Sequence, residues 1–284
     1  MRDSPLLTVE PSKWRDLYVR VASAVVLIPV VLALTWAGSI WFGLLVASMG
    51  VLMAFEWTKL VHDSAPVQFA LHAAAALAAA LLPGVIDMSL LIGLIVIVWA
   101  ASVLYRLWTH PRPSFWTIVG IPYITLSALS VVLLRNDAQF GLLAVYWLLF
   151  VVWGADTLAY FAGRTIGGPK LLPAISPRKT WVGLAGAIVG GLICSVLFAW
   201  AVGLEGLAWF ALVGGLMAVV EQAGDYFESA LKRSTGVKDS SALIPGHGGM
   251  LDRVDGLVAA AIFAALVGGV RSGFSSPAAG ILTW

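Results

Sequence analysis

Acidic side chains follow a helical spacing near residue 225 of this 284-residue chain. Asp225, Glu228 and Lys232 are separated by three or four residues, so a helix would place them on one face, with Glu221 one turn earlier. Carboxylates on one face repel each other unless a cation lies among them. We interpret Asp225 and Glu228 as parts of a site rather than as a solvated helix end. For Glu221 the two interpretations are equally supported.

A second acidic pair, Asp252 and Asp255, has i, i+3 spacing at the start of an apolar segment. These residues could cap a helix N-terminus, but two acids entering an apolar segment are costly for capping alone. Together with Asp225, they could bring carboxylate oxygens from two helices to a hard cation such as Mg²⁺. Histidine and cysteine do not cluster with these acids, which disfavours a zinc site.

Cations and a third acid precede this region. Asp156 and Arg164 share one face of a predicted helix. Arg178 and Lys179 are adjacent in a polar loop that contains Ser176. Two adjacent cations suit a polyphosphate or an anionic headgroup, although such pairs more often mark only the cytoplasmic side of a membrane protein.

The polar insert 232–255 adds Lys238 and a glycine-rich run with Gly248 and Gly249. The backbone N–H groups of a glycine-rich loop can bind phosphate oxygens. His247, in the same run, could donate a hydrogen bond to phosphate or shape the loop. Acids for a metal and cations for phosphates together indicate phosphoryl or nucleotidyl transfer, which relies on metal ions and cations to position phosphates.

The composition determines which elements must position these residues. The chain is 60% hydrophobic and 11% charged, with a mean hydropathy of +0.94 and a net charge of +2. Soluble domains contain about 25% charged residues, so a water-soluble enzyme, a disordered chain and a collagen-like fibre are excluded. The small net charge also disfavours a nucleic-acid partner. We predict an all-α, polytopic integral membrane protein.

Apolar windows of about 20 residues predict nine transmembrane helices. The expected spans are residues 18–37, 40–58, 68–86, 88–106, 115–134, 140–162, 182–203, 207–227 and 255–271. A cytoplasmic N-terminus places fifteen of the 17 lysines and arginines on the cytoplasmic side and leaves only Arg135 and Arg271 opposite, as the positive-inside rule requires.

The spans divide the chain into two expected regions. Residues 1–150 form an N-terminal region of about five spans, where Glu56, near a span end, is at least as well explained by snorkelling or capping as by function. Residues 151–284 form a catalytic region with cytoplasmic loops 163–181 and 230–254.

The C-terminal motifs resemble those of the CDP-diacylglycerol synthases, or phosphatidate cytidylyltransferases. Residues 229–255 read SALKRSTGVKDSSALIPGHGGMLDRVD and are similar to the family signature over its full length. The segments GDYFES at 224–229, DTLAY at 156–160 and SPRKTW at 176–181 look like other family motifs. The resemblance covers roughly residues 153–256. One departure is Val182, where many members have glutamate.

The resemblance implies a nucleotidyltransferase of phospholipid biosynthesis. It converts CTP and phosphatidate into CDP-diacylglycerol and pyrophosphate with Mg²⁺, and a second metal ion is compatible with its acids. Homodimers are known in the family. The expected location is a bacterial plasma membrane, with the active site facing the cytoplasm. Alternatives are a cytidylyltransferase for an ether-lipid or polyprenyl phosphate and a non-catalytic lipid-binding or transport protein.

The resemblance also suggests roles for individual residues. The expected metal ligands are Asp225 and Asp252, supported by Asp156, Glu228 and Asp255. The expected catalytic residues are Asp225, Asp252, Lys238, Arg253 and His247. The expected substrate-binding residues are Ser176, Arg178, Lys179, Lys232, Arg233, Gly248 and Gly249.

Overall fold

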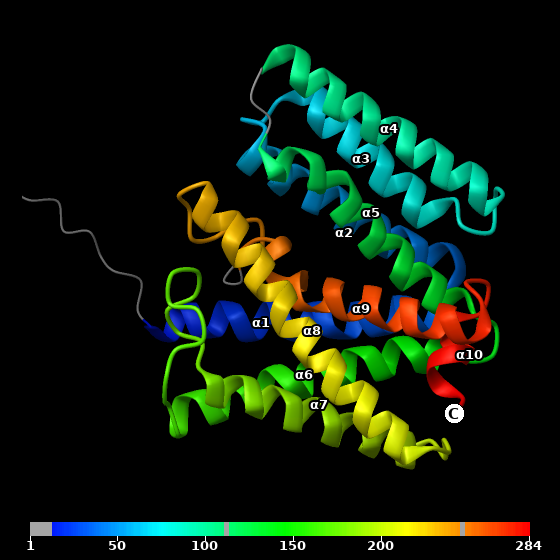
Figure 1. Ribbon diagram of the computed structural model, residues 1–284, viewed down its shortest axis with the longest axis vertical. Coiled ribbons are helices and arrows are strands. Elements are labelled where there is room, and N and C mark those ends of the chain that lie inside the picture. The colour runs from blue at the N-terminus through cyan, green and yellow to red at the C-terminus, as the bar shows by residue number, and fades with distance from the viewer. Residues whose placement is uncertain (1–12, 111–113, 245–247) are drawn as a thin grey trace, which may run out of the picture.

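The computed structural model describes residues 13–110, 114–244 and 248–284, and it is a bundle of helices (Figure 1). Within these ranges the only β-structure consists of isolated bridges. The helices are α1 (Lys13–Ala37), α2 (Ser39–Val61), α3 (Pro66–Leu81), α4 (Met88–Thr109), α5 (Phe115–Asn136), α6 (Gly141–Thr165), α7 (Trp181–Ala201), α8 (Leu207–Ser234), α9 (Leu251–Ser272) and α10 (Pro277–Leu282).

The predicted all-α membrane fold is confirmed, and α1 to α9 follow the predicted spans in order. In the described part of the chain, seven helices are long and apolar enough to cross a membrane, and the apolar segments Val21–Ala37 and Pro66–Leu81 are shorter. Many large apolar side chains point outward, such as Ile97 and Leu104 on α4. The protein is therefore an integral membrane protein.

Several helix ends lie a few residues from the predicted span limits, and two of these differences have a clear local cause. α3 ends at Leu81 rather than near residue 86, because Pro83 disfavours helical geometry before it and Gly84 adopts a φ of +82°. α8 continues to Ser234, because an acid–lysine pair stabilises its last turns. The polar loops of the C-terminal half are consequently 166–180 and 235–250, and the short helix α10 was not predicted.

Helices α6 and α7 approach each other closely, as the small-residue spacing of α7 predicts. A Cβ atom on Gly186 would lie 2.6 Å from the Cβ of Ala162, and one on Gly190 would lie 2.6 Å from the carbonyl oxygen of Gly154. Neither position has room for a larger side chain. This contact fixes the ends of α6 and α7 next to each other.

The helices form two groups joined by α9. In Figure 1, α2 to α5 lie in the upper part and α6 and α7 in the lower part, α8 runs diagonally from the lower right to the upper left, and α9 crosses between the two groups. Helix α9 packs against α5, α6 and α8. The loop 166–180 lies at the left of the view, at the same end of the bundle as the C-terminus of α8, and α10 lies at the right. The two polar loops therefore belong to one end of the bundle, which we call the site end.

Candidate functional site

A polar pocket of about 610 Å³ opens between α6, α7, α8 and the loop 166–180. Its volume falls in the range typical of small-molecule sites. Cations and carboxylates both line it. The ionisable side chains of its wall are Asp156, Tyr160, Arg164, Lys170, Arg178, Lys179 and Asp225.

The loop 166–180 is held against the pocket by backbone hydrogen bonds. Leu171 N–H donates to Lys179 O at 3.1 Å, and Trp181 N–H donates to Pro169 O at 3.1 Å. Thr180 is the N-cap of α7, and its hydroxyl accepts from Gly183 N–H at 3.0 Å. These bonds bring the predicted residues Arg178 and Lys179 to the pocket wall.

Lys179 connects the loop to α8. Its Nζ atom lies 2.6 Å from Asp225 Oδ2 and donates to Gln222 Oε1 at 2.9 Å. It also lies 4.8 Å from the centre of the Tyr226 ring. The Lys179 and Asp225 side chains remain 20% and 29% exposed, so this ion pair is accessible from the pocket.

The end of α6 forms the opposite wall. Tyr160 OH accepts a hydrogen bond from Arg164 at 2.6 Å, and Asp156 lies two turns before Arg164 on the same pocket surface. The predicted shared face of Asp156 and Arg164 is therefore confirmed. The wall thus presents a positive group near the loop and a negative group deeper along the helix.

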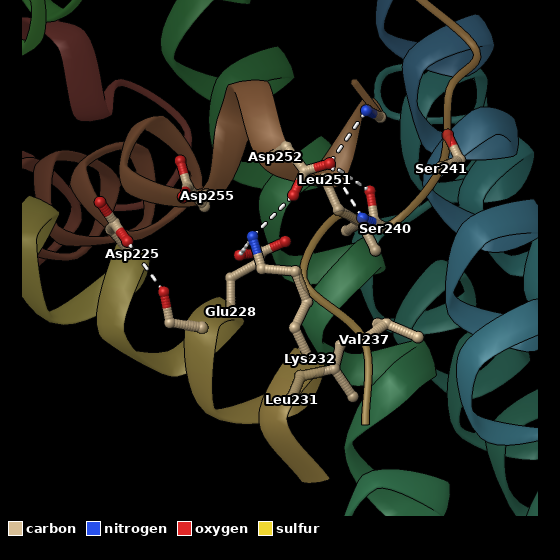
Figure 2. Close-up of polar contacts among 12 residues, drawn as sticks. Asp225, Glu228, Leu231, Lys232, Val237, Ser240, Ser241, Leu251, Asp252 and Asp255 are labelled. Carbon is tan, nitrogen blue, oxygen red and sulfur yellow. Dashed lines mark hydrogen bonds and ion pairs between the residues drawn. The ribbon is translucent and has the colours of Figure 1, made fainter. Parts of the chain in front are cut away.

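A second cluster of charges joins α8 to α9 (Figure 2). Lys232 Nζ lies 2.5 Å from Glu228 Oε2 and 2.6 Å from Asp252 Oδ1. Glu228 is only 1% exposed, and a carboxylate in such a position requires a cationic partner. Lys232 therefore links the acidic face predicted on α8 to the acidic pair predicted on α9.

Asp252 is held by four donors. Its Oδ1 accepts from Lys232, and its Oδ2 accepts from Ser240 N–H at 3.0 Å, Ser240 Oγ at 2.8 Å and Gly249 N–H at 2.9 Å. This arrangement fixes the orientation of the carboxylate. The Gly249 amide, which the sequence suggests for phosphate binding, has Asp252 as its partner here.

Asp225 and Asp255 are less completely bonded. Figure 2 shows Asp225 on α8 and Asp255 on α9 near each other. Ser229 Oγ donates to Asp225 Oδ1 at 3.3 Å, and Gly256 N–H donates to Asp255 Oδ1 at 2.8 Å. Two neighbouring carboxylates attract a cation into the space between them.

The other predicted residues lie around these clusters. Arg233 donates to Ile175 O at 3.3 Å and to Val237 O at 3.1 Å, so it ties α8 to both polar loops. Lys238 and Arg253 are exposed, and Ser176 is half-buried with its N–H bonded to a loop carbonyl. Gly248 has a φ of +85°, which favours glycine. His247 lies outside the described residues.

The donor set fits a hard divalent cation by its chemistry. Among the residues that the structure describes, no three acidic, histidine or cysteine side chains converge closely enough to form a complete metal site. Mg²⁺ in phosphate-transfer sites is commonly bound by one or two carboxylates together with substrate phosphates and water. The acids of α8 and α9 satisfy that requirement.

Three contributors were missed by sequence reasoning. Gln222 bonds Lys179, Lys170 lines the pocket, and Ser240 bonds Asp252. Gln222 is adjacent to Glu221 in the sequence, and its amide donates to Glu221 Oε2 at 2.9 Å. Its position in the acidic segment could therefore have indicated that it belongs to the site. For Ser240, a serine in a polar loop, the sequence carried no signal.

Comparison with known proteins supports the family resemblance that the sequence motifs suggest. The model of the cytidylyltransferase family matches residues 18–270. A phosphatidate cytidylyltransferase of Brucella abortus is 42% identical over 264 residues, covering 90% of this chain and 94% of the relative. Proteins of the same name from Pseudomonas aeruginosa and Bacillus subtilis are 34% and 32% identical, covering 87% and 84% of this chain and 96% and 93% of the relatives.

Proposed function

Because the chain belongs to the cytidylyltransferase family, we propose that it transfers CMP from CTP to phosphatidate, forming CDP-diacylglycerol and pyrophosphate. The observation that carries this proposal is the polar pocket at the site end of a membrane-embedded bundle. A charged pocket within apolar helices suits the meeting of a soluble triphosphate with a lipid phosphate. The names of the relatives favour phosphatidate over ether-lipid and polyprenyl phosphates.

The reaction is an in-line displacement at phosphorus. An oxygen of the phosphatidate phosphate forms a bond to the α-phosphorus of CTP, and the bond from that phosphorus to the bridging oxygen of the β-phosphate breaks. Pyrophosphate leaves with the electron pair. The attacking oxygen is already anionic near neutral pH, so no strong general base is required. The protein must chiefly orient two anions and reduce their repulsion.

The cations of the pocket provide this orientation. We propose that Arg164, Lys170 and Arg178 bind the triphosphate, because they surround the pocket on two sides. Lys179 and Lys232 each lie beside a carboxylate, so each can exchange that partner for a phosphate oxygen when substrate enters. Arg253, Arg233 and Lys238 extend the positive surface at the same end.

Mg²⁺ is proposed as the metal, with Asp225 and Asp252 as its holders and Asp156, Glu228 and Asp255 as supporting carboxylates. When bound, the ion would withdraw charge from the phosphate oxygens. The donors around Asp252 keep its carboxylate in one orientation. Asp225 is paired with Lys179 and also accepts a hydrogen bond from the Ser229 hydroxyl.

The location proposed for the active site is the cytoplasmic side of a bacterial plasma membrane. The excess of lysine and arginine on one side of the predicted spans supports this orientation, and the relatives are bacterial. Cysteine labelling from outside intact cells, at positions in loop 166–180 and near Arg135, tests the orientation. Light scattering of the detergent-solubilised protein tests the homodimer that the resemblance implies.

The substrate proposal is tested with purified protein, radiolabelled CTP and Mg²⁺. Phosphatidate, an ether-lipid phosphate and a polyprenyl phosphate are supplied in parallel. We expect CDP-lipid to form with phosphatidate at a kcat/KM at least about tenfold above that of the other two lipids. Preference for either other lipid would reject phosphatidate as the substrate.

A further inference from the structure

Glu56, on α2, contacts the segment that carries Asp252 although the two residues are far apart in the sequence. The Glu56 side chain is 0% exposed. Its Oε1 atom accepts from Ser241 Oγ at 2.5 Å and from Met250 N–H at 2.8 Å. Its Oε2 atom accepts from Leu251 N–H at 2.7 Å and lies 3.1 Å from Ser240 Oγ, whose single hydroxyl hydrogen it shares with Asp252. Four donors from one loop and one helix start therefore converge on a single carboxylate.

These bonds supply a cap that α9 lacks locally. The N-cap residue Met250 makes no side-chain capping bond. The first amides of a helix have no partner within the helix and favour a negative group. Glu56 satisfies the amides of Met250 and Leu251. The snorkelling expected for Glu56 is not observed, whereas capping is, and the capped helix is α9 rather than its own α2.

Ser240 and Leu251 connect Glu56 to Asp252. Ser240 Oγ lies within hydrogen-bonding distance of both Glu56 Oε2 and Asp252 Oδ2, at 3.1 and 2.8 Å. Asp252 is the residue after Leu251, whose amide Glu56 holds, and Figure 2 shows Ser240, Leu251 and Asp252 close together. A Cβ atom on Gly249 would overlap Ser240 Oγ and approach Glu56 Oε1 to 2.5 Å, so this packing requires glycine.

An apolar cluster surrounds the base of this network. Trp57, Leu231, Leu251 and Val254 belong to one buried apolar cluster, and Trp57, the neighbour of Glu56 in the chain, and Leu251, whose N–H donates to Glu56, connect this cluster to Glu56. A charged side chain in such surroundings is unfavourable unless its hydrogen bonds are satisfied. The Glu56 carboxylate therefore depends on these four donor groups. If loop 235–250 moved away, the carboxylate would be left buried without hydrogen-bond partners.

We infer that Glu56 is a positioning residue, which sets the place of Asp252 by holding Ser240 and the first turn of α9. This inference rests on the proposed function, because it assigns Glu56 a role in the same active site. It also makes the N-terminal half of the chain part of that site. Among the residues that the structure describes, Glu56 does not line the pocket and forms no ion pair with a lysine, so we assign its effect to the placement of Asp252.

The test compares Glu56→Gln with a matched change elsewhere in the N-terminal half. Gln68 is also 0% exposed, and it bonds Ser102 through Oε1 at 2.6 Å and Nε2 at 2.9 Å without reaching the site. Gln68→Leu therefore removes buried hydrogen bonds of similar kind. Glu56→Asp and Ser240→Ala complete the set, the first keeping the charge and the second removing only the hydroxyl that bonds both acids.

We expect Glu56→Gln to lower kcat at least about tenfold and to raise the Mg²⁺ concentration for half-maximal activity, because Asp252 is no longer fixed. Glu56→Asp should recover part of the loss. Ser240→Ala should lose less than Glu56→Gln, and the double variant should lose less than the product of the two single effects, since both act on one network. The kcat of Gln68→Leu should stay within about twofold of the wild-type value when equal amounts of folded protein are assayed.

Hydrogen exchange of residues 248–256 in metal-free protein provides a readout that does not require catalysis. We expect faster exchange in Glu56→Gln and unchanged exchange in Gln68→Leu. Wild-type kcat and exchange in Glu56→Gln would overturn the inference, as would equal losses in Glu56→Gln and Gln68→Leu. If Glu56→Gln fails to fold, unchanged kcat and exchange in Ser240→Ala overturn it instead. An inactive wild type would reject the proposed function, whereas faster exchange in Glu56→Gln would still support the structural link.

Discussion

Charged side chains at the two ends of the bundle have different partners. At the site end, Lys179 lies against Asp225, and Lys232 lies between Glu228 and Asp252. These ion pairs join side chains to side chains. A substrate phosphate or a metal ion can replace one partner in such a pair without breaking the backbone structure.

At the opposite end, the charges bond the backbone. Arg135 donates to Thr35 O at 2.7 Å and to Trp36 O at 3.1 Å. Asp137 accepts from the amides of Gln139, Phe140 and Ala279 at 2.9 to 3.0 Å. These contacts join α1, α5, α6 and α10, so the charges at this end hold helix ends together.

Arg271 completes the opposite end. It bonds the carbonyl oxygens of Gly280 and Thr283 and lies 3.7 Å from the centre of the Trp284 ring. The difference between the ends teaches that the partner of a charge, rather than its burial, separates a binding role from a structural one. Some charges at the site end also bond the backbone: Glu56 accepts from amides and hydroxyls, and Arg233 donates to two carbonyl oxygens. Asp252 combines both kinds of partner, because it accepts from Lys232 and from two amides.

The largest expected effect follows from removing one carboxylate of the site end. Asp225→Asn and Asp252→Asn should each lower kcat about 1,000-fold or more, because each removes a carboxylate that we propose as a metal ligand. Thermal unfolding in detergent should change little for Asp225→Asn, whose side chain is partly exposed. Near-normal turnover in either variant would remove that residue from the site.

Substitution of Lys179 and of Lys232 at the site end should affect the stability of the protein differently. Lys179→Met and Lys232→Met should each lower kcat/KM about 100-fold, since each variant loses a cation that we propose to bind phosphate. Only Lys232→Met should also reduce the free energy of unfolding strongly, by about 3 kcal/mol, because it leaves the buried Glu228 unpaired. Thermal unfolding and initial rates measured on the same preparations check this, and equal loss of stability would refute the distinction.

A change in the loop should have an intermediate effect. Gly249→Ala should lower kcat about tenfold, because the added methyl group displaces Ser240 and thereby Asp252. Gly93→Ala on α4 is the matched control, since no atom lies within 4 Å of the added group. Equal activity of the two variants would show that the packing around Gly249 does not matter for turnover.

The smallest effect on turnover is expected at the opposite end. Arg135→Leu should leave kcat within about twofold of the wild type, yet it should lower the melting temperature by about 5 °C, because two carbonyl groups lose a charged donor. Arg271→Leu should behave alike. Loss of turnover without loss of stability in either variant would break the comparison between the two ends.

Much of the fold was predictable because lipid requires long apolar helices, and such segments are visible in the sequence. The end of α3 was harder to predict, because Pro83 and Gly84 interrupt a segment that remains apolar on both sides. The continuation of α8 to Ser234 was also missed. Its last turns are polar, but the ion pair between Glu228 and Lys232 maintains the helix.

The site was predictable where its residues follow a helical period. Asp225, Glu228 and Lys232 lie as their spacing implies, and Lys232 reaches Asp252 across the two helices. The bonds of Glu56 were not predictable, because its donors lie 184 to 195 residues further along the chain and no periodicity relates such distant positions. Only the packing of α2, α5 and α9 brings them together.

Asp225, which pairs with Lys179 at the site end, is expected to be required for CMP transfer, whereas Arg135, which bonds backbone carbonyl groups at the opposite end, is expected not to be. The most direct measurement compares wild type, Asp225→Asn and Arg135→Leu in one assay of radiolabelled CMP transfer to phosphatidate, at equal amounts of folded protein. We expect CDP-lipid from wild type and Arg135→Leu at similar rates and almost none from Asp225→Asn. Similar rates from Asp225→Asn and wild type, or no product from the wild type, would contradict it.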